Sequence, residues 1–466
     1  MSDSHGSVVS IAHTDEKHRT IERVTALVRQ ALDALGGVSR FVRPGQTVLI
    51  KPNQTVYYSA EEGCTTDPLV VGSLIRLARE AGARRVQIAE SSGGFFDSIE
   101  CMKITGVAAI AEREGAELVD LGRCPTRDTP IPEGKVIQSC PIPVALLEAD
   151  VVIDCPKAKN HHVQPISGAL KNWVGAVNAE WRQVNHGTPE MFGKFMDVMT
   201  VSRPHLCVCD ALIVGEGDGP IGNLPRWCGC VLASEDPVAM DVTICGLLGH
   251  DWRTLRFIPE AVARGLGVAE PIRYVGEALE DVRVEAWKPH AGWDYLPINF
   301  LVGEGVTLEG TIGHVKSVLD SMLRRGELAE VTWLRGTPTV MVGAIEDPRF
   351  EEHLREGPYV VFDDAALAKY KGDSRVTFVP GHPVLRSAMP ALQRGLGVRA
   401  PGEVAQKLQQ WERRGMHALK YGTPARKAKA VLVPLAVVSA LVAGFVAITN
   451  TLVAKRRGPL LARLLG

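Results

Sequence analysis

The alternation of short apolar runs with helical patterns is the feature that most constrains the fold of this chain. Residues 7–12, 48–50 and 86–89 are short, apolar and rich in β-branched side chains, as expected of buried strands. The segments between them place apolar residues at helical spacing. This order is typical of a parallel sheet covered by helices. The sequence therefore predicts an α/β main domain built on a parallel sheet.

Capping residues predict where several helices begin and end. A helix over residues 18–35 stops at Gly36-Gly37, and Thr66-Asp67-Pro68 supplies an N-cap and a first-turn proline for a helix that runs to Glu80. We also predict one helix near residues 103–114 and a Gly-rich loop over residues 215–222. Further strands are predicted over residues 117–121, 150–154, 206–210 and 230–233.

A second set of strand and helix patterns begins near residue 296. It contains a predicted helix over residues 313–325 and strands over 339–342, 359–362 and 376–379. The sequence thus predicts three parts: a main α/β domain over residues 1–294, a smaller α/β domain over 295–422, and a basic linker with an apolar helix and a short tail over 423–466.

Residues 430–454 form an apolar run without a charged side chain. As a helix this run would be roughly 37 Å long, which exceeds the roughly 30 Å of a bilayer core. Basic residues flank both ends, where they can reach the lipid headgroups. We predict a single-pass transmembrane helix with the lipid bilayer as its partner; the alternative is a buried core helix. The polar N-terminus lacks a signal sequence, so we expect the main domains to be cytoplasmic.

The overall composition excludes some classes of protein. Of the 466 residues, 52 are Lys or Arg and 53 are Asp or Glu, so the chain lacks the basic excess of a nucleic-acid-binding protein. The 10 cysteines are scattered and form no disulfide framework, which indicates a reducing compartment. The oligomeric state does not follow from the sequence.

Cations and amide groups are concentrated just after the predicted strand over residues 150–154. Lys157, Lys159, His161, Lys171 and Asn172 all lie in this short segment. Such a density of donors suits an anionic ligand, either a carboxylate or a phosphate. A solvated charged loop is the alternative. His161 is followed by a second histidine, and neighbouring side chains on a strand face opposite ways, so we expect one of the two in the site.

Other candidates lie further from this segment. His186 can carry a proton near neutral pH. Asp210 ends a predicted strand and Asp218 lies in the Gly-rich stretch, so the pair is a candidate site for a divalent metal. Ser91 and Gly93 follow a strand and form a loose candidate anion cradle that does not match GxGxxG.

Two Cys-x-Cys pairs raise a redox alternative. Together they place four thiols in the chain: Cys207, Cys209, Cys228 and Cys230. A four-thiolate metal or iron–sulfur site needs such a set. The spacing differs from the usual C-x₂-C arrangement, so we do not expect a cluster.

An ordered series of motifs over roughly residues 45–270 resembles the domain of unknown function 362 (DUF362) family. The series is Lys51-Pro-Asn53, TTDP at 65–68, PKAKNH at 156–161, GALKNWVG at 168–175, His186, Asp210, GDGP at 217–220 and DPVAMD at 236–241. The resemblance marks as site positions Lys157, Lys159, His161, Lys171, Asn172, His186, Asp210 and Asp241.

The resemblance to this family also raises the question of an iron–sulfur cofactor. Many members of the family carry ferredoxin-type clusters, but this sequence lacks the C-x₂-C-x₂-C run, so the cluster is not carried over. The general layout also resembles the lactate-racemase family, which uses a nickel-pincer nucleotide. The family name implies no reaction.

These observations predict a membrane-tethered enzyme that holds a small anionic substrate or cofactor. We expect catalytic roles for His161, His186 and Lys171 and ligand contacts from Lys51, Asn53, Ser91, Gly93, Lys157, Lys159 and Asn172. The cofactor is unknown. A non-catalytic membrane-associated binding or scaffold protein and a redox protein are the alternatives.

Overall fold

The computed structural model describes most of the first 303 residues and parts of the chain up to residue 398. The described ranges are 6–93, 96–161, 164–186, 190–220, 222–289, 296–303, 311–324, 337–343, 359–362, 376–379 and 385–398, with residues 328, 372 and 374. The predicted transmembrane helix over residues 430–454 lies outside them. Among the described residues, no helix is both long and apolar enough to cross a membrane.

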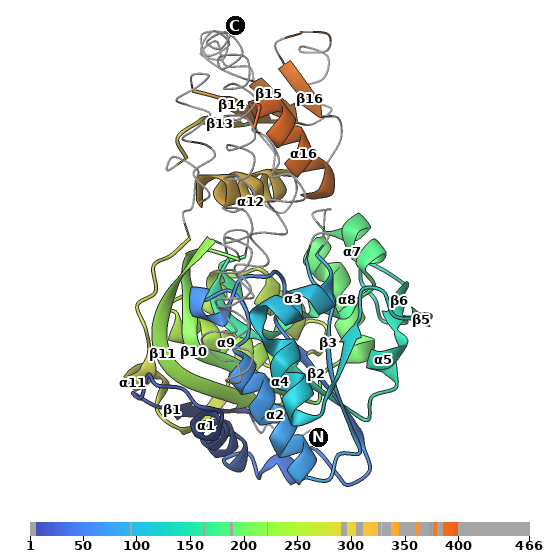
Figure 1. Cartoon of the computed structure of the whole chain (residues 1–466), viewed down its shortest axis with the longest axis vertical. Helices are drawn as coiled ribbons and strands as arrows, with labels where there is room; N and C mark the ends of the chain where they lie inside the picture. Colours follow the sequence, from blue (N-terminus) through green and yellow to red (C-terminus); the bar gives the residue numbers. More distant parts are fainter. Residues whose placement is uncertain are drawn as a thin grey trace, which may run out of the picture. The chain divides into compact units, whose positions relative to one another are not determined.

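A large mixed sheet forms the centre of the main body (Figure 1). Its strand order is β12-β1-β11-β10-β7-β2-β3-β4, and the short strands β8 and β9 pair beside β10. The strands are β1 (Ser7–His13), β2 (Thr47–Pro52), β3 (Arg85–Glu90), β4 (Glu117–Asp120), β7 (Val151–Cys155), β8 (Lys157–Asn160), β9 (Ile166–Ser167), β10 (Leu206–Asp218), β11 (Gly222–Ser234) and β12 (Ile272–Gly276).

Helices cover both faces of this sheet. Side chains alternate along β2, where Val48 and Ile50 join one apolar cluster and Leu49 joins the other. The Val48 cluster packs under α1 (Ile21–Asp33), α2 (Pro68–Glu80) and α4 (Val107–Glu114). The other face is covered by residues of α6 (Ala169–Asn172), α8 (Met191–Ser202), α9 (Pro237–Leu247) and α10 (Phe257–Val262). The main body is therefore a three-layer α/β structure, as the sequence predicts in outline.

Three local predictions differ from the structure. The helix predicted near 103–114 is two helices, α3 (Ser98–Thr105) and α4, because Gly106 adopts a φ of 91° that interrupts helical geometry. Most of the loop predicted over 215–222 is strand: residues 215–218 end β10 and Gly222 begins β11, and these two 13-residue strands pair antiparallel. Since β11 is also antiparallel to β1, the sheet is mixed and not wholly parallel.

The remaining elements of the main body are short. The proline-rich stretch near 124–143 forms a separate hairpin of β5 (Thr126–Pro130) and β6 (Ser139–Pro143). The other helical segments are α5 (Val144–Leu147), α7 (Ala179–Asn185), α11 (Leu279–Val282), η1 (Val38–Arg40), η2 (Ala60–Glu62), η3 (Trp173–Ala176) and η4 (Trp252–Thr254).

A second sheet lies further along the chain. Four parallel strands are paired in chain order: β13 (Asn299–Val302), β14 (Thr339–Val342), β15 (Tyr359–Phe362) and β16 (Val376–Val379). Residues of α12 (Thr311–Arg324) and α16 (Leu385–Leu396) share one apolar cluster with this sheet. The three predicted strands are confirmed, and the domain boundaries at 294 and 422 stay predictions.

Candidate functional site

The candidate site lies where the carboxyl ends of β2, β3 and β7 meet. The chain runs from β2 to β3 to β4 on one side of β2 and then places β7 on the other side. Such a reversal of strand order leaves a crevice at the carboxyl ends, the usual ligand position in open α/β sheets. Lys51, the second-last residue of β2, lies directly opposite Asp154 of β7, so the reversal point carries two ionisable side chains.

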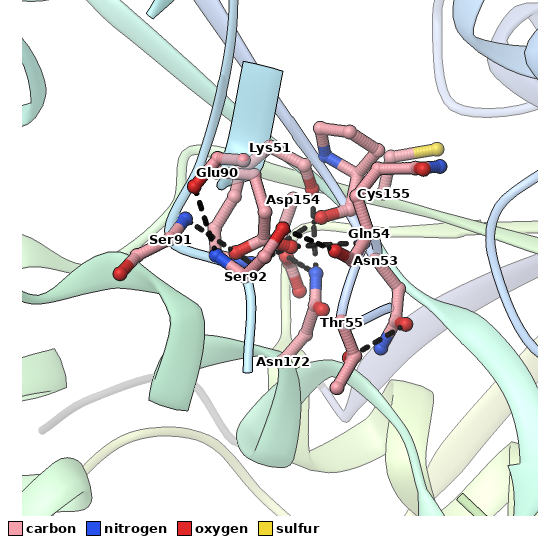
Figure 2. Close-up of polar contacts among 12 residues, drawn as sticks. Lys51, Asn53, Gln54, Thr55, Glu90, Ser91, Ser92, Asp154, Cys155 and Asn172 are labelled. Atoms are coloured by element: carbon pink, nitrogen blue, oxygen red, sulfur yellow. Dashed lines mark hydrogen bonds and ion pairs between the residues drawn. The ribbon is translucent and has the colours of Figure 1, made fainter. Parts of the chain in front are cut away.

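An ion pair between Lys51 and Glu90 lies at the centre of this region (Figure 2). Lys51 Nζ is 3.1 Å from Glu90 Oε1 and 3.2 Å from Oε2, and both side chains are buried. The backbone N–H groups of Ser91 and Gln54 also donate to the Glu90 carboxylate, at 2.8 and 2.9 Å. A buried charge needs such partners. Lys51 is therefore held within the protein, although the sequence predicts that it contacts a ligand.

Asp154 lies beside this pair and was not predicted as a site residue. Asn172 Nδ2 donates to its Oδ1 at 2.7 Å (Figure 2). Its buried Oδ2 accepts no hydrogen bond from any described residue. Burial raises the pKa of Asp154 to about 7, against the opposing effects of Lys51 and Asn172. The sequence does contain a signal that marks Asp154 as a candidate site residue, because it is the one charged residue of an otherwise apolar strand.

The segment over residues 168–176 covers these strand ends. Asp241, which is fully buried in α9, accepts hydrogen bonds from Ala169 N at 2.5 Å and Leu170 N at 3.2 Å and so caps α6. A Cβ at Gly168 would lie 2.1 Å from Asp241 Oδ1, and one at Gly175 would lie 1.9 Å from Glu90 Oε1. Both glycines thus permit close contact with a buried carboxylate of the protein itself.

Lys157 forms a second buried ion pair. Its Nζ donates to Asp210 Oδ2 at 2.8 Å, and neither side chain is exposed. Asp67 N and Leu212 N donate to the same Asp210 carboxylate at 2.7 and 3.0 Å. In the structure Asp210 is therefore the counter-ion of Lys157, and the ligand contact that the sequence predicts for Lys157 stays a prediction.

Lys159 is buried without a carboxylate partner. Its Nζ donates to Cys64 O at 2.5 Å, Asn53 Oδ1 at 3.3 Å and Pro220 O at 3.4 Å. Three neutral acceptors match the three N–H groups of an ammonium. Burial lowers the pKa of Lys159 to about 8. Lys159 is therefore a fixed positive charge whose donors are occupied, and Asn53 is one of the groups that hold it.

Lys171 is different from the other three lysines. Its side chain is half-buried on α6, and no described residue forms a hydrogen bond or ion pair with its ammonium group. Burial, and secondly the positive charge of Lys159, lower the pKa of Lys171 to about 7. Around neutral pH this amine can accept or give up a proton.

The backbone N–H groups of the predicted anion cradle donate to oxygen atoms of the protein itself. Ser91 N donates to Glu90 Oε1 and to Gly175 O, and Gly93 N donates to Thr55 O at 2.8 Å. The guanidinium of Arg182, which is also buried, donates to Ser91 Oγ and to the Ser91 and Ser92 carbonyls. The backbone donors of Ser91 and Gly93 therefore hold the loop in place.

The predicted histidines are only partly described. His161 is buried, and its Nδ1 accepts a hydrogen bond from Gln164 N at 3.3 Å. His186 is half-buried at the end of α7. Their catalytic roles stay predictions. His162 lies outside the described residues.

The predicted metal pair is not brought together. Asp210 and Asp218 lie eight residues apart on β10, which is roughly 26 Å of strand at about 3.3 Å per residue. Because a strand does not fold back on itself, their carboxylates cannot share one ion. Within the described ranges, no group of three or more His, Cys, Asp or Glu side chains is arranged to hold a metal.

The four cysteines of the redox alternative lie in the apolar core. Cys207 and Cys209 on β10 and Cys228 and Cys230 on β11 belong to the same hydrophobic cluster. Burial raises the pKa of Cys207 and Cys209 well above the usual thiol value. Metal and cluster ligation needs thiolates, so this environment favours a structural role for these cysteines.

Part of the chain matches a known protein family. Residues 48–246 match the family described as "Domain of unknown function (DUF362)". The chain is also 27% identical over 271 residues to the "Thylakoid-associated protein sll1697" of Synechocystis sp., a match that covers 56% of this chain and 82% of that protein.

Two solved structures are also similar to this chain. One is the lactate racemase apoprotein from Thermoanaerobacterium thermosaccharolyticum, with 11% identity, a TM-score of 0.37 and coverage of 84% of this chain and 81% of that one. The other is a protein from Thermotoga maritima, with 12% identity, a TM-score of 0.33 and coverage of 81% and 92%.

Proposed function

We propose that the region over residues 48–246, which matches the DUF362 family, binds a small organic anion beside Lys159 and Lys171. One observation carries the proposal: these two lysines lack a carboxylate partner among the described residues, whereas Lys51 and Lys157 each have one. An uncompensated positive charge in a buried region is costly. A bound anion would supply the missing counter-charge.

The two lysines have separate roles in this proposal. Lys159, with its three N–H groups occupied, attracts the anion through its charge. Lys171 has donors that no described residue occupies, so it contacts the ligand directly. Because its pKa is lowered to about 7, Lys171 also serves as the proton-transferring group of an enzyme acting on this anion.

Calorimetric titration of the full-length protein with acetate, pyruvate or inorganic phosphate tests this proposal. At least one of these anions should bind at pH 7, and Lys171→Met should weaken its binding tenfold or more. Lys103→Met is the matched control, since Lys103 is exposed and pairs only with a surface glutamate. Binding should also take up protons, because an anion raises the pKa of Lys171. The proposal fails if none of the three anions binds, or if Lys171→Met binds as the unaltered protein does.

We propose in addition that residues 430–454 tether the protein to a membrane. The charge-free apolar run and its basic flanks support this proposal, as does the name of the thylakoid-associated relative. The full chain should stay in the membrane pellet after carbonate extraction, and a chain ending at Gly422 should be released. Equal extraction of the two would refute the tether.

A further inference from the structure

A pocket at the β12 edge of the large sheet has no part in the proposed anion site. Its volume is about 450 Å³, within the roughly 300–1,000 Å³ that is usual for small-molecule sites. Val242 of α9, Ile272 of β12 and Leu279 of α11 give it an apolar wall, and Trp252 adds an aromatic ring. The pocket is therefore large enough, and apolar enough, to hold the body of a small organic ligand.

The charged side chains of this pocket are predominantly acidic. Among the described residues that line it, Asp251 and Glu270 are acids and Arg253 is the one Lys or Arg. Two carboxylates and one guanidinium leave a net charge of −1. Charge complementarity therefore favours a cationic ligand.

His250 also lines the pocket and adds no positive charge to it near neutral pH. Its Nε2 lies 2.8 Å from Asn160 Oδ1. Burial, and secondly the charge of Lys288, lower the pKa of His250 to about 4. The imidazole is therefore neutral at pH 7 and does not repel a cation.

The guanidinium of Arg253 marks the position where the pocket holds a cation. Its Cζ lies 4.6 Å from the centroid of the Trp252 ring, and its Nη2 forms an ion pair with Glu270. Its Nη1 lies 3.7 Å from Asp251 Oδ1. The face of a tryptophan ring attracts a cation, and nearby carboxylates add to this attraction. Because all three charged side chains are more than half exposed, these ion pairs are weak and a ligand can replace them.

We propose that this pocket binds a small organic amine, with the apolar part of the ligand against Val242, Ile272 and Leu279 and its ammonium beside Glu270. The ammonium takes the place of the Arg253 guanidinium on the Trp252 ring. Arg253 is thus an internal competitor of the ligand. This site is separate from the proposed anion site and does not depend on it.

Three compounds that share a phenyl ring test the proposal: phenethylamine is cationic, 2-phenylethanol is neutral and phenylacetate is anionic. The full-length protein is titrated with each at pH 7, and dissociation constants are measured by ligand-observed NMR. Phenethylamine should bind about fivefold or more tightly than the other two compounds, because only its charge is complementary to the pocket.

Two variants should change amine binding in opposite directions. Glu270→Gln removes a carboxylate and should weaken phenethylamine binding about two- to fivefold, whereas Arg253→Met removes the competitor and should strengthen it by a similar factor. Arg256→Met is the matched control, since Arg256 is exposed, lies outside the pocket and pairs with Glu260 on the next helical turn. Lys171→Met should also leave phenethylamine binding unchanged.

Three results would overturn the proposal. The first is that phenethylamine does not bind. The second is that Arg253→Met weakens its binding, which would mean that the guanidinium does not occupy the ammonium position. The third is that phenylacetate binds more tightly than phenethylamine and loses this binding in Arg253→Met, in which case the pocket is a site for anions.

Discussion

The internal role of Lys157 can be tested by replacing each member of its ion pair. The sequence groups Lys157 with the ligand-binding lysines, whereas the structure pairs it with Asp210 at 2.8 Å, with both side chains fully buried. Lys157→Met would leave the Asp210 carboxylate in the core without its cation. Breaking a buried pair in this way costs about 3–5 kcal/mol.

This cost corresponds to a large thermal shift. For a body of this size about 1 kcal/mol shifts the melting temperature by roughly 2–4 °C, so Lys157→Met should lower it by roughly 6–20 °C. Asp210→Asn should have a comparable effect, because the Lys157 ammonium is then unpaired. The double variant should lose less than the sum of the two single variants, since both buried charges are removed together.

The assay is differential scanning fluorimetry of the four proteins with and without a saturating carboxylate such as pyruvate. The ligand should raise the melting temperature of Lys157→Met as much as that of the unaltered protein. The reasoning is refuted if Lys157→Met melts within about 2 °C of the unaltered protein and loses its response to pyruvate. Lys157 would then be a ligand contact.

Three further predictions concern the same region, each read from thermal midpoints. The pKa of Lys171 is lowered to about 7, so the folded state binds fewer protons than the unfolded state between about pH 7 and 10. The free energy of unfolding should therefore rise with pH in this window. Lys171→Met should make this rise smaller. The pKa of Asp154 is raised to about 7, so stability should fall from about pH 4 to 7, and an unchanged fall in Asp154→Asn would contradict the assignment. Gly175→Ala would place a Cβ 1.9 Å from Glu90 Oε1 and 3.0 Å from Lys51 Nζ; it should cost about 1–3 kcal/mol, and an unshifted midpoint would show that the segment is loosely packed.

Local signals in the sequence were sufficient for much of the fold. The helix predicted from Pro68 to Glu80 has those bounds in the structure, and Asp67 Oδ1 accepts from Leu69 N as its cap. Such a helix start depends on side chains next to the helix itself. The antiparallel placement of β11 between β1 and β10 was missed, because strand order depends on contacts between distant parts of the chain.

In the candidate site, too, some features follow from the local sequence and others only from contacts between distant residues. From the sequence alone, the density of lysines and amides after β7 determined where polar chemistry concentrates. Only the tertiary structure decided which lysines lack a carboxylate partner among the described residues. Glu90 lies 39 residues from Lys51, and Asp210 lies 53 residues from Lys157. Strand pairing brings these partners together, and because removing one member of a buried ion pair is costly, the three-dimensional contacts distinguish the paired Lys51 and Lys157 from Lys159 and Lys171.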